Sequence, residues 1–238
     1  MVGMLSDVGL FRKLNEDYLG YHEDDDFKIY VVADGMGGHN AGEVASKLAV
    51  EKTIEYVKNN KSNGKLEEVL ISAIQEANLT IYKEAQSDIS LNGMGTTITA
   101  CIIDFKNIFV ANVGDSSCYF VEDDKIYKVT KDHSLVQELI DSGSITEEQA
   151  INHPNKNIIT RALGTNNEVK VDIFSFEKVG IKKVVLCSDG LTNVVTKEEI
   201  YDVAHDNDNI TASSKLIELS IQKGSRDNIS VMIFEGEC

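Results

Sequence analysis

The sequence has no tryptophan, one proline and four cysteines among its 238 residues. The cysteines show neither Cys-x-x-Cys pairs nor any regular spacing, so a disulfide framework is not predicted. Cys101, Cys118 and Cys187 each fall inside an apolar, β-like run, where cysteine behaves as a small buried hydrophobe. This use of cysteine indicates a reducing compartment, and we expect a cytoplasmic protein.

Long apolar runs and positive charge are also scarce. No apolar run approaches the roughly 18 residues of a membrane-spanning helix, and no signal-peptide pattern opens the chain. Lys and Arg total 23 against 39 Asp and Glu, which gives a formal net charge of −16. Such an acidic surface repels nucleic acids and anionic membranes, so neither is expected as a main partner. It suits divalent cations and basic surfaces, although we interpret most of the excess as serving solubility.

What the sequence does contain is enough apolar material for a substantial core. Hydrophobic residues make up 42% of the chain, which excludes wholesale disorder. No internal repeat, low-complexity tract or Gly/Ser linker divides it, and we expect a single domain over residues 1–238. Strand-like runs rich in Val, Ile, Phe, Tyr and Thr are predicted at 27–33, 96–104, 108–113 continuing to 121, 125–129, 171–176, 183–187 and 229–234.

Helical periodicity appears in four other stretches, and a further segment, 132–164, is helical only in short pieces and holds Pro154. Strands outnumber helices and do not alternate with them, which argues against a doubly wound parallel sheet. Short turns between strands favour antiparallel pairing. We therefore predict an α+β fold of two antiparallel sheets, covered on their outer faces by helices at 42–58, 66–85, 197–205 and 210–223.

Four aspartates stand at the ends of predicted strands. Asp34, Asp115 and Asp189 each follow an apolar run, whereas Asp227 precedes one. If the last strand runs opposite to the others, all four carboxylates reach the same edge of the core. Each lies beside Gly, Ser or Asn, residues that allow sharp turns. For any one of them turn chemistry is the simpler interpretation, but four without a matched set of Lys or Arg indicate a site.

Carboxylates gathered on one rim repel each other unless a cation lies among them. Oxygen ligands without Cys or His indicate a hard ion such as Mg²⁺ or Mn²⁺. Several aspartates can hold two such ions about 3.5–4 Å apart, an arrangement that polarises a phosphoryl group and activates a water molecule. The small Gly35 leaves its carbonyl free as a further ligand. Near the N-terminus, Arg12 has the shape to grip a phosphate, although an Arg close to an acid such as Glu16 is by itself typical of a surface pair.

At this point the sequence resembles a known family, the metal-dependent protein phosphatases of type 2C, and in particular the small bacterial serine/threonine phosphatases that oppose Hanks-type kinases. The resemblance runs from Ser6 to about Phe234, nearly the whole chain, and its motifs occur in the family's order. The motifs are individually moderate and together highly specific: "RKLNED", "ADGMGGHNAGEVAS", "GMGTTITA", "ANVGDSSCYF", "HPNKNIITRALG", "LCSDGLT" and "RDNISVMIF".

The resemblance implies a four-layer αββα sandwich that binds two Mn²⁺ or Mg²⁺ ions at one end, with residues 132–164 as a mobile flap beside the site. Carried over position by position, Asp34 would bridge both ions, and Asp189 and Asp227 would complete one of them. The carbonyl of Gly35 and the side chain of Glu16, directly or through water, would serve the other.

Two further roles follow from the same resemblance. Asp115 would help Asp189 to hold a weaker third ion, and Arg12 would bind the phosphate. The implied activity is hydrolysis of phosphoserine and phosphothreonine in proteins by a metal-activated water. The implied partners are phosphorylated proteins and a cognate serine/threonine kinase, and we expect a monomer.

The chain departs from the family pattern at two places. Met36 stands where many eukaryotic relatives have a histidine proposed as general acid, so another group or water must protonate the leaving alkoxide. His39 lies three residues on, and a structural role for it is favoured. Ser225-Arg226 stands where relatives often have a second glycine, which adds a positive group near Asp227. His133 and His153, in the flap segment, are interpreted as ordinary hydrogen-bonding residues.

Other classes of function fit the sequence less well. A metal-free signalling module of the same fold would normally lack ligands, whereas every expected carboxylate is present. The acidic stretches "HDNDNI" and "HEDDDF" lack the glycine and closing glutamate of an EF-hand. The loop "GMGGHNAG" fits neither common nucleotide-binding pattern. Phosphatases that act on sporulation or anti-sigma antagonists share the architecture but usually carry sensor domains, for which this chain has no room.

Overall fold

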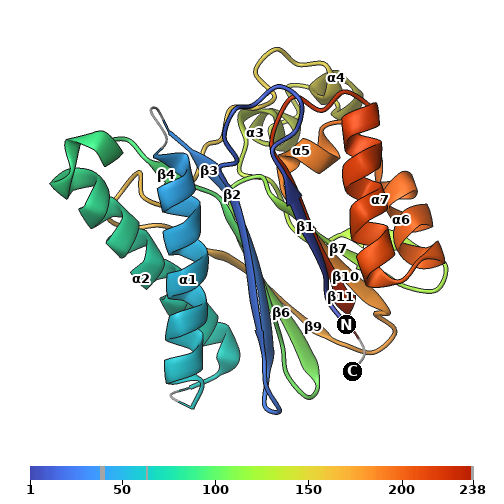
Figure 1. The fold of residues 1–238 in the computed structure, drawn as a ribbon, viewed down its shortest axis with the longest axis horizontal. Helices are drawn as coiled ribbons and strands as arrows, with labels where there is room; N and C mark the ends of the chain where they lie inside the picture. Colours follow the sequence, from blue (N-terminus) through green and yellow to red (C-terminus); the bar gives the residue numbers. More distant parts are fainter. Residues whose placement is uncertain (38–40, 63, 237–238) are drawn as a thin grey trace.

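The computed structural model describes residues 1–37, 41–62 and 64–236. Two sheets pack face to face between two pairs of helices (Figure 1). One sheet has the strand order β1-β11-β10-β7-β8, with bounds Gly3–Asp7, Ile229–Glu235, Lys183–Cys187, Ser117–Val121 and Ile126–Lys128. The other has the order β2-β3-β5-β6-β9, with bounds Asp17–Glu23, Lys28–Met36, Ile98–Ile103, Asn107–Val113 and Asp172–Glu177, and the short β4 (Gly95–Thr96) also pairs with β3.

The outer layers are helical. Helices α1 (Gly42–Asn60) and α2 (Leu66–Ser87) cover the β2–β9 sheet, and α6 (Lys197–Asp206) and α7 (Asn209–Gln222) cover the β1–β8 sheet. Side-chain caps fix two of the helix starts: Thr196 forms a capping box before α6, and Asp208 accepts hydrogen bonds from the first turn of α7.

Apolar residues fill each of the three interfaces between these layers. One group lies between α1, α2 and their sheet, a second between the two sheets, and a third between the other sheet and α6 and α7. At the centre of the second group the rings of Tyr30 and Phe234 stack with centroids 3.5 Å apart. All strand pairings are antiparallel, so the predicted α+β sandwich of four layers is confirmed.

The two N-terminal strands were not predicted. Among the described residues β1 pairs only with β11, and β2 lies at an edge beside β3, with Gly20 at its centre. Most residues of these strands are only partly buried, so they lack the apolar runs that mark the central strands. A side chain at position 20 would meet Val50 and Ile54 of α1, so the glycine lets the helix approach the strand closely.

The continuous run predicted from 108 to 121 is wrong, because the chain changes sheets within it. Gly114 has φ of 109°, a left-handed conformation that ends β6, and β7 begins three residues later in the other sheet. The segment 132–164 contains two short helices, α3 (Leu135–Asp141) and α4 (Glu147–Ile151), joined by irregular chain.

The topology brings several strand ends to one edge of the sandwich. β3 and β6 both pair antiparallel with β5, so they run parallel to each other and end on the same side. β10 ends there and β11 starts there, because Cys187 pairs with Val231. Helix α5 (Asp189–Thr192) begins directly after β10, and α3, α4 and α5 lie at this end of the molecule (Figure 1). Among the described helices, none combines the length and apolar character needed to cross a bilayer.

Candidate metal centre and phosphate site

Asp34 lies within β3 rather than at its end, since the strand continues for two residues to pair with β4. Its backbone is held on both sides: its N–H donates to Thr97 Oγ1 at 2.9 Å, and its carbonyl accepts from Thr97 N–H at 2.9 Å. A side chain at Gly35 would collide with the carbonyls of Glu16 and Gly42. The glycine therefore lets α1 and the N-terminal loop pack against β3 directly beside Asp34.

Asp115, Asp189 and Asp227 come from three different connections. Asp115 lies between β6 and β7, Asp189 is the first residue of α5, and Asp227 precedes β11. Gly190 fits directly against the Asn228 carbonyl, where a side chain would collide, and this contact places α5 against the start of β11. Asn193 Nδ2 donates to Asp189 Oδ2 at 2.9 Å.

The four predicted aspartates form one electrostatic cluster. Burial, followed by repulsion from Asp189, Asp115 and Asp227 among others, raises the pKa of Asp34 well above its ordinary value. Burial also raises the pKa of Asp115 and Asp189, and repulsion from a neighbouring aspartate adds to each. The side chain of Asp189 accepts a hydrogen bond from Asn193, which partly offsets this rise. The cluster therefore has more negative charge than it can hold without a counter-charge.

Arg12 and Glu16 lie beside this cluster on the loop between β1 and β2. Arg12 Nη2 forms a 2.8 Å ion pair with Asp227 Oδ2, and 49% of its side chain stays exposed. The Glu16 carboxylate lies against Gly42, the first residue of α1, where a side chain would collide with it. Asn228 fastens the loop, because its side chain accepts from Glu16 N–H at 2.9 Å and donates to the carbonyls of Val8 and Leu14.

Sequence reasoning missed a fifth aspartate of the cluster, Asp17, which is buried. It is the register partner of Asp34 across β2 and β3, and Ser188 Oγ donates to its Oδ2 at 2.7 Å. Burial, reinforced by repulsion from Asp189 and Asp227, raises the pKa of Asp17 to about 7. Its position directly after Glu16 was the available signal, but no apolar run precedes it as one precedes Asp34.

Three of these carboxyls suit a hard cation. One oxygen in each of Asp17, Asp115 and Asp189 is buried and has no hydrogen-bond partner. Unpartnered buried oxygens are costly unless a cation or a donor meets them, and oxygen-only donor sets favour Mg²⁺, Mn²⁺ or Ca²⁺. In the described part of the chain, no three of these side chains already converge on one point. The donor set itself fits the predicted type of ion.

The other residues singled out from the sequence lie elsewhere. Met36 ends β3, with its terminal methyl against Gly95, and offers no proton to a leaving group. His39 lies outside the described residues. His153 accepts from Asn155 N–H within its own turn, as an ordinary hydrogen-bonding residue. Arg226 is exposed and lies over the Phe11 ring.

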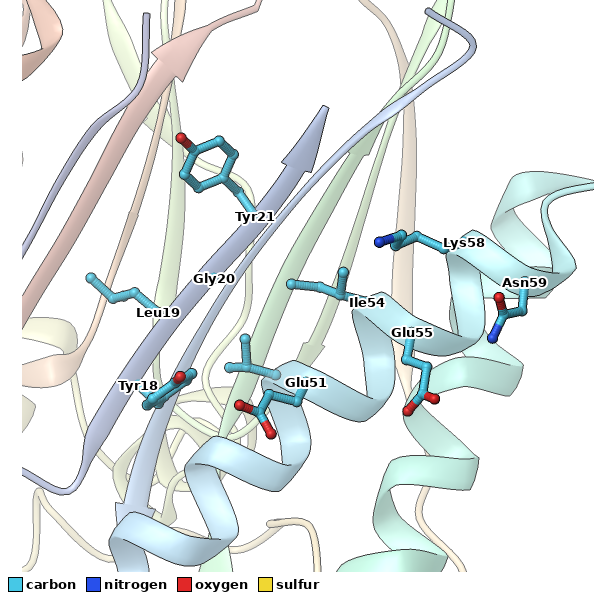
Figure 2. Close-up of a pocket in the computed structure, with 10 residues that line it drawn as sticks. Tyr18, Leu19, Gly20, Tyr21, Glu51, Ile54, Glu55, Lys58 and Asn59 are labelled. Carbon is cyan, nitrogen blue, oxygen red and sulfur yellow. The ribbon is translucent and has the colours of Figure 1, made fainter. Parts of the chain in front are cut away.

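Two hollows differ in their relation to the cluster. A cleft of about 300 Å³ lies between Asp115, Asp189 and the segment holding α3 and α4. A groove of about 440 Å³ lies between β2 and α1, where Tyr18, Tyr21 and Ile54 surround the bare backbone of Gly20 (Figure 2). None of the predicted ligands lines the second groove, so the first is the candidate substrate approach.

A four-layer sandwich with an acidic rim and an arginine at one edge defines a metal-dependent phosphatase. Comparison with known proteins agrees: the family model described as "Protein phosphatase 2C" matches residues 12–215. The chain belongs to the protein phosphatase 2C family. It is accordingly a hydrolase, a serine/threonine protein phosphatase whose substrates are phosphoproteins. Metal dependence is a property of this family, and the family resemblance predicted from the motifs is confirmed.

Relatives and solved structures are similar over nearly the whole chain. The serine/threonine phosphatase stp of Listeria welshimeri is 41% identical over 235 residues, covering 97% of this chain and 93% of the relative. PstP of Mycobacterium tuberculosis is 36% identical over 96% of this chain and 43% of its own length. A solved bacterial serine phosphatase superposes with a TM-score of 0.91 at 33% identity, covering 98% of this chain and 96% of the other. The catalytic domain of PstP, solved in complex with two manganese ions, has a TM-score of 0.85 at 33% identity, with coverage of 98% and 96%.

Proposed function

We propose that this chain hydrolyses phosphoserine and phosphothreonine esters with two Mn²⁺ or Mg²⁺ ions held at the acidic rim. Asp34, Asp189, Asp227, the Gly35 carbonyl and Glu16 would hold them, and Asp115 with Asp189 would hold a weaker third ion. The observation that carries the proposal is the gathering of buried, mutually repelling carboxyls with unpartnered oxygens at one edge. When bound, such ions neutralise phosphate charge and lower the pKa of water towards neutrality.

The chain's own residues position the substrate. Arg12 is partly exposed and already directed at the rim by Asp227, so it can bind the phosphate oxygens that do not react. The cysteines at 101, 118 and 187 are buried in strands, and burial raises the pKa of each thiol, so none of these three is available as a nucleophile. Direct attack by water is therefore the route we propose, without a phosphoenzyme.

The proposal extends to the cellular setting. A cognate serine/threonine kinase would supply the phosphorylated substrates, because an esterase of this type consumes the product of a phosphoryl transfer. The acidic surface, with a net charge of −16, supports neither nucleic acid nor an anionic membrane as a partner. We propose a monomer that acts in the cytoplasm on phosphoproteins.

Phosphate release from a phosphothreonine peptide, measured with Mn²⁺ and with excess EDTA, tests the proposal. We expect turnover that requires the metal and is lost on chelation. Arg12→Ala should raise KM for the peptide, whereas Lys13→Ala, which removes a charge from the neighbouring exposed position, should not. Equal turnover with and without EDTA, by protein shown to be metal-free, would contradict the proposed role of the rim.

A further inference from the structure

His133 is almost completely buried, with 7% of its surface exposed, yet it belongs to none of the proposed ligand sets. It follows β8 and stands at the start of the segment that carries α3 and α4. Its backbone N–H donates to the Gly114 carbonyl at 2.9 Å, and its Nδ1 accepts from the Gly114 N–H at 3.0 Å. This histidine therefore holds both polar groups of the residue immediately before Asp115.

Gly114 has little other freedom. Its φ of 109° suits glycine alone, and a side chain there would lie 2.6 Å from the Thr97 side chain. Asn112 Nδ2 also donates to its carbonyl at 3.1 Å. The direction in which the Asp115 carboxylate leaves the backbone is therefore set by these few bonds, of which His133 provides two.

The far edge of the imidazole ring meets an acid and a base. His133 Nε2 lies 3.2 Å from Asp172 Oδ2, and Arg161 Nη1 donates to Asp172 Oδ1 at 2.7 Å. Because Nδ1 accepts a hydrogen bond, the ring proton must sit on Nε2 and point to Asp172. Arg161 Nη1 lies 2.8 Å from Nε2, and both groups donate to the Asp172 carboxylate rather than to each other.

The two ends of the segment 132–164 also meet here, through contacts between residues 133–135 and 158–160 that we call its neck. Thr160 N–H donates to the His133 carbonyl at 2.8 Å, and Leu135 N–H donates to the Ile158 carbonyl at 2.9 Å. Ser134 and Ile159 form a bridge between them. The two ends of the segment 132–164 thus meet at His133, whose ring reaches the Asp115 loop on one edge and Asp172 on the other.

We propose that His133 is a positioning residue that sets the Asp115 carboxylate for cation binding through its bond to Gly114, and that joins this loop to the neck of the 132–164 segment through Asp172 and Arg161. The inference rests on the proposed role of Asp115 as a ligand. It assigns a function to a residue that touches neither the substrate nor the ions. One consequence is that the two edges of the ring have separable effects.

Substitutions can separate the two edges. Asparagine can place its Oδ1 where Nδ1 lies, so His133→Asn keeps an acceptor for the Gly114 N–H but loses the reach to Asp172. His133→Ala loses both links, and Asp172→Asn leaves the histidine in place but removes the charge that its Nε2 proton meets. Mn²⁺ binding to each full-length protein is measured by calorimetry, and hydrogen exchange is followed in the peptide covering residues 109–117.

We expect His133→Ala to weaken the Asp115-dependent Mn²⁺ binding by about 10-fold, the effect typical of residues that orient a ligand. Hydrogen exchange in the 109–117 peptide should become faster. His133→Asn should keep most of the wild-type Mn²⁺ affinity and most of the wild-type protection of the 109–117 peptide from exchange. Asp172→Asn should speed exchange mainly in the neck, at residues 158–162. If His133→Ala fails to fold, the comparison of His133→Asn with Asp172→Asn still separates the loop from the neck.

Two results would overturn the inference. The first is wild-type Mn²⁺ binding in His133→Ala alongside a lowered melting temperature, which would reduce His133 to a structural role. The second is an equal loss of Mn²⁺ affinity in His133→Ala and His133→Asn. This would show that the bond from Gly114 N–H to the residue at 133 does not position Asp115. Asp115→Asn serves as the control: if it leaves Mn²⁺ binding unchanged, the ligand assignment fails rather than the positioning by His133.

Discussion

The space between the two sheets and the rim at their edge use the same strands for opposite purposes. Between the sheets, Tyr30 of β3 stacks on Phe234 of β11, and the surrounding residues are apolar and buried. At the rim, four residues further along β3, Asp34 is half-buried and meets other carboxyls. One region stabilises the fold by burial, and the other carries unfavourable charge repulsion.

This difference shows how the fold stays stable despite the repulsion between the carboxyls at the rim. A strand cannot shift its register at one end without moving the whole row of side chains, so the apolar middle fixes where the carboxyls stand. The free energy gained by apolar burial along the same strands then offsets the unfavourable repulsion between the carboxyls at the rim. Changes in the middle should therefore affect stability first, and changes at the rim should affect activity first.

The largest expected effect on stability is in the middle layer. Phe234→Ala should lower the free energy of unfolding by about 3–5 kcal/mol, because it removes a fully buried ring and leaves a cavity against Tyr30. Phe105→Ala is the matched control, since that ring is 85% exposed, and it should change stability by less than about 0.5 kcal/mol. Urea unfolding followed by circular dichroism measures the free energy of unfolding of both variants. An equal loss in the two would contradict the distinction between the buried middle layer and the surface.

At the rim we expect activity and stability to separate. Asp189→Asn should lower metal-supported turnover by at least about 100-fold, because a ligand to the proposed ions is lost. In EDTA the same variant should melt at a higher temperature than the wild type, because one of several repelling charges has been removed. Asp202→Asn, at an exposed position on α6, should alter neither quantity. A lower melting temperature for Asp189→Asn in EDTA would contradict the repulsion.

The smallest effect is a pH dependence confined to the metal-free protein. Burial raises the pKa of Asp17 to about 7 and that of Asp115 to about 8, both above the values in an unfolded chain. The folded protein therefore binds more protons than the unfolded chain in this range, and its stability falls as pH rises through it. The melting temperature in EDTA should drop by about 3 °C between pH 7 and pH 8.5, and saturating Mn²⁺ should abolish the drop. A melting temperature that rises over this interval would contradict the assignment.

Much of the site could be predicted because its members adjoin the most recognisable strands. Asp34, Asp115 and Asp189 each follow a buried apolar run, and an antiparallel topology then leaves few ways to arrange their ends. Asp17 could not be found in this way, since β2 is an edge strand with mixed burial. Only the register across β2 and β3 places it opposite Asp34.

Positioning residues were harder to predict than the acids they support. Asn228 follows Asp227 in a recognised motif, but its three bonds to the β1–β2 loop depend on residues more than 200 positions away. The change of sheets at Gly114 was missed because the residues on both sides of it favour strands. Local propensity cannot show that a glycine within such a run has a left-handed φ.

The pairing of β1 with β11 has a consequence for the assembly of the site. β1 is the first of the described strands along the chain, yet its only strand partner in the described structure is β11, the last of them. Asp227 and Asn228 directly precede β11, whereas Arg12 and Glu16 lie on the loop between β1 and β2. Until β11 is placed, the loop between β1 and β2 lacks its bonds to Asn228 and the rim lacks the Asp227 carboxylate. A chain that lacks β11 therefore cannot assemble the proposed metal and phosphate site.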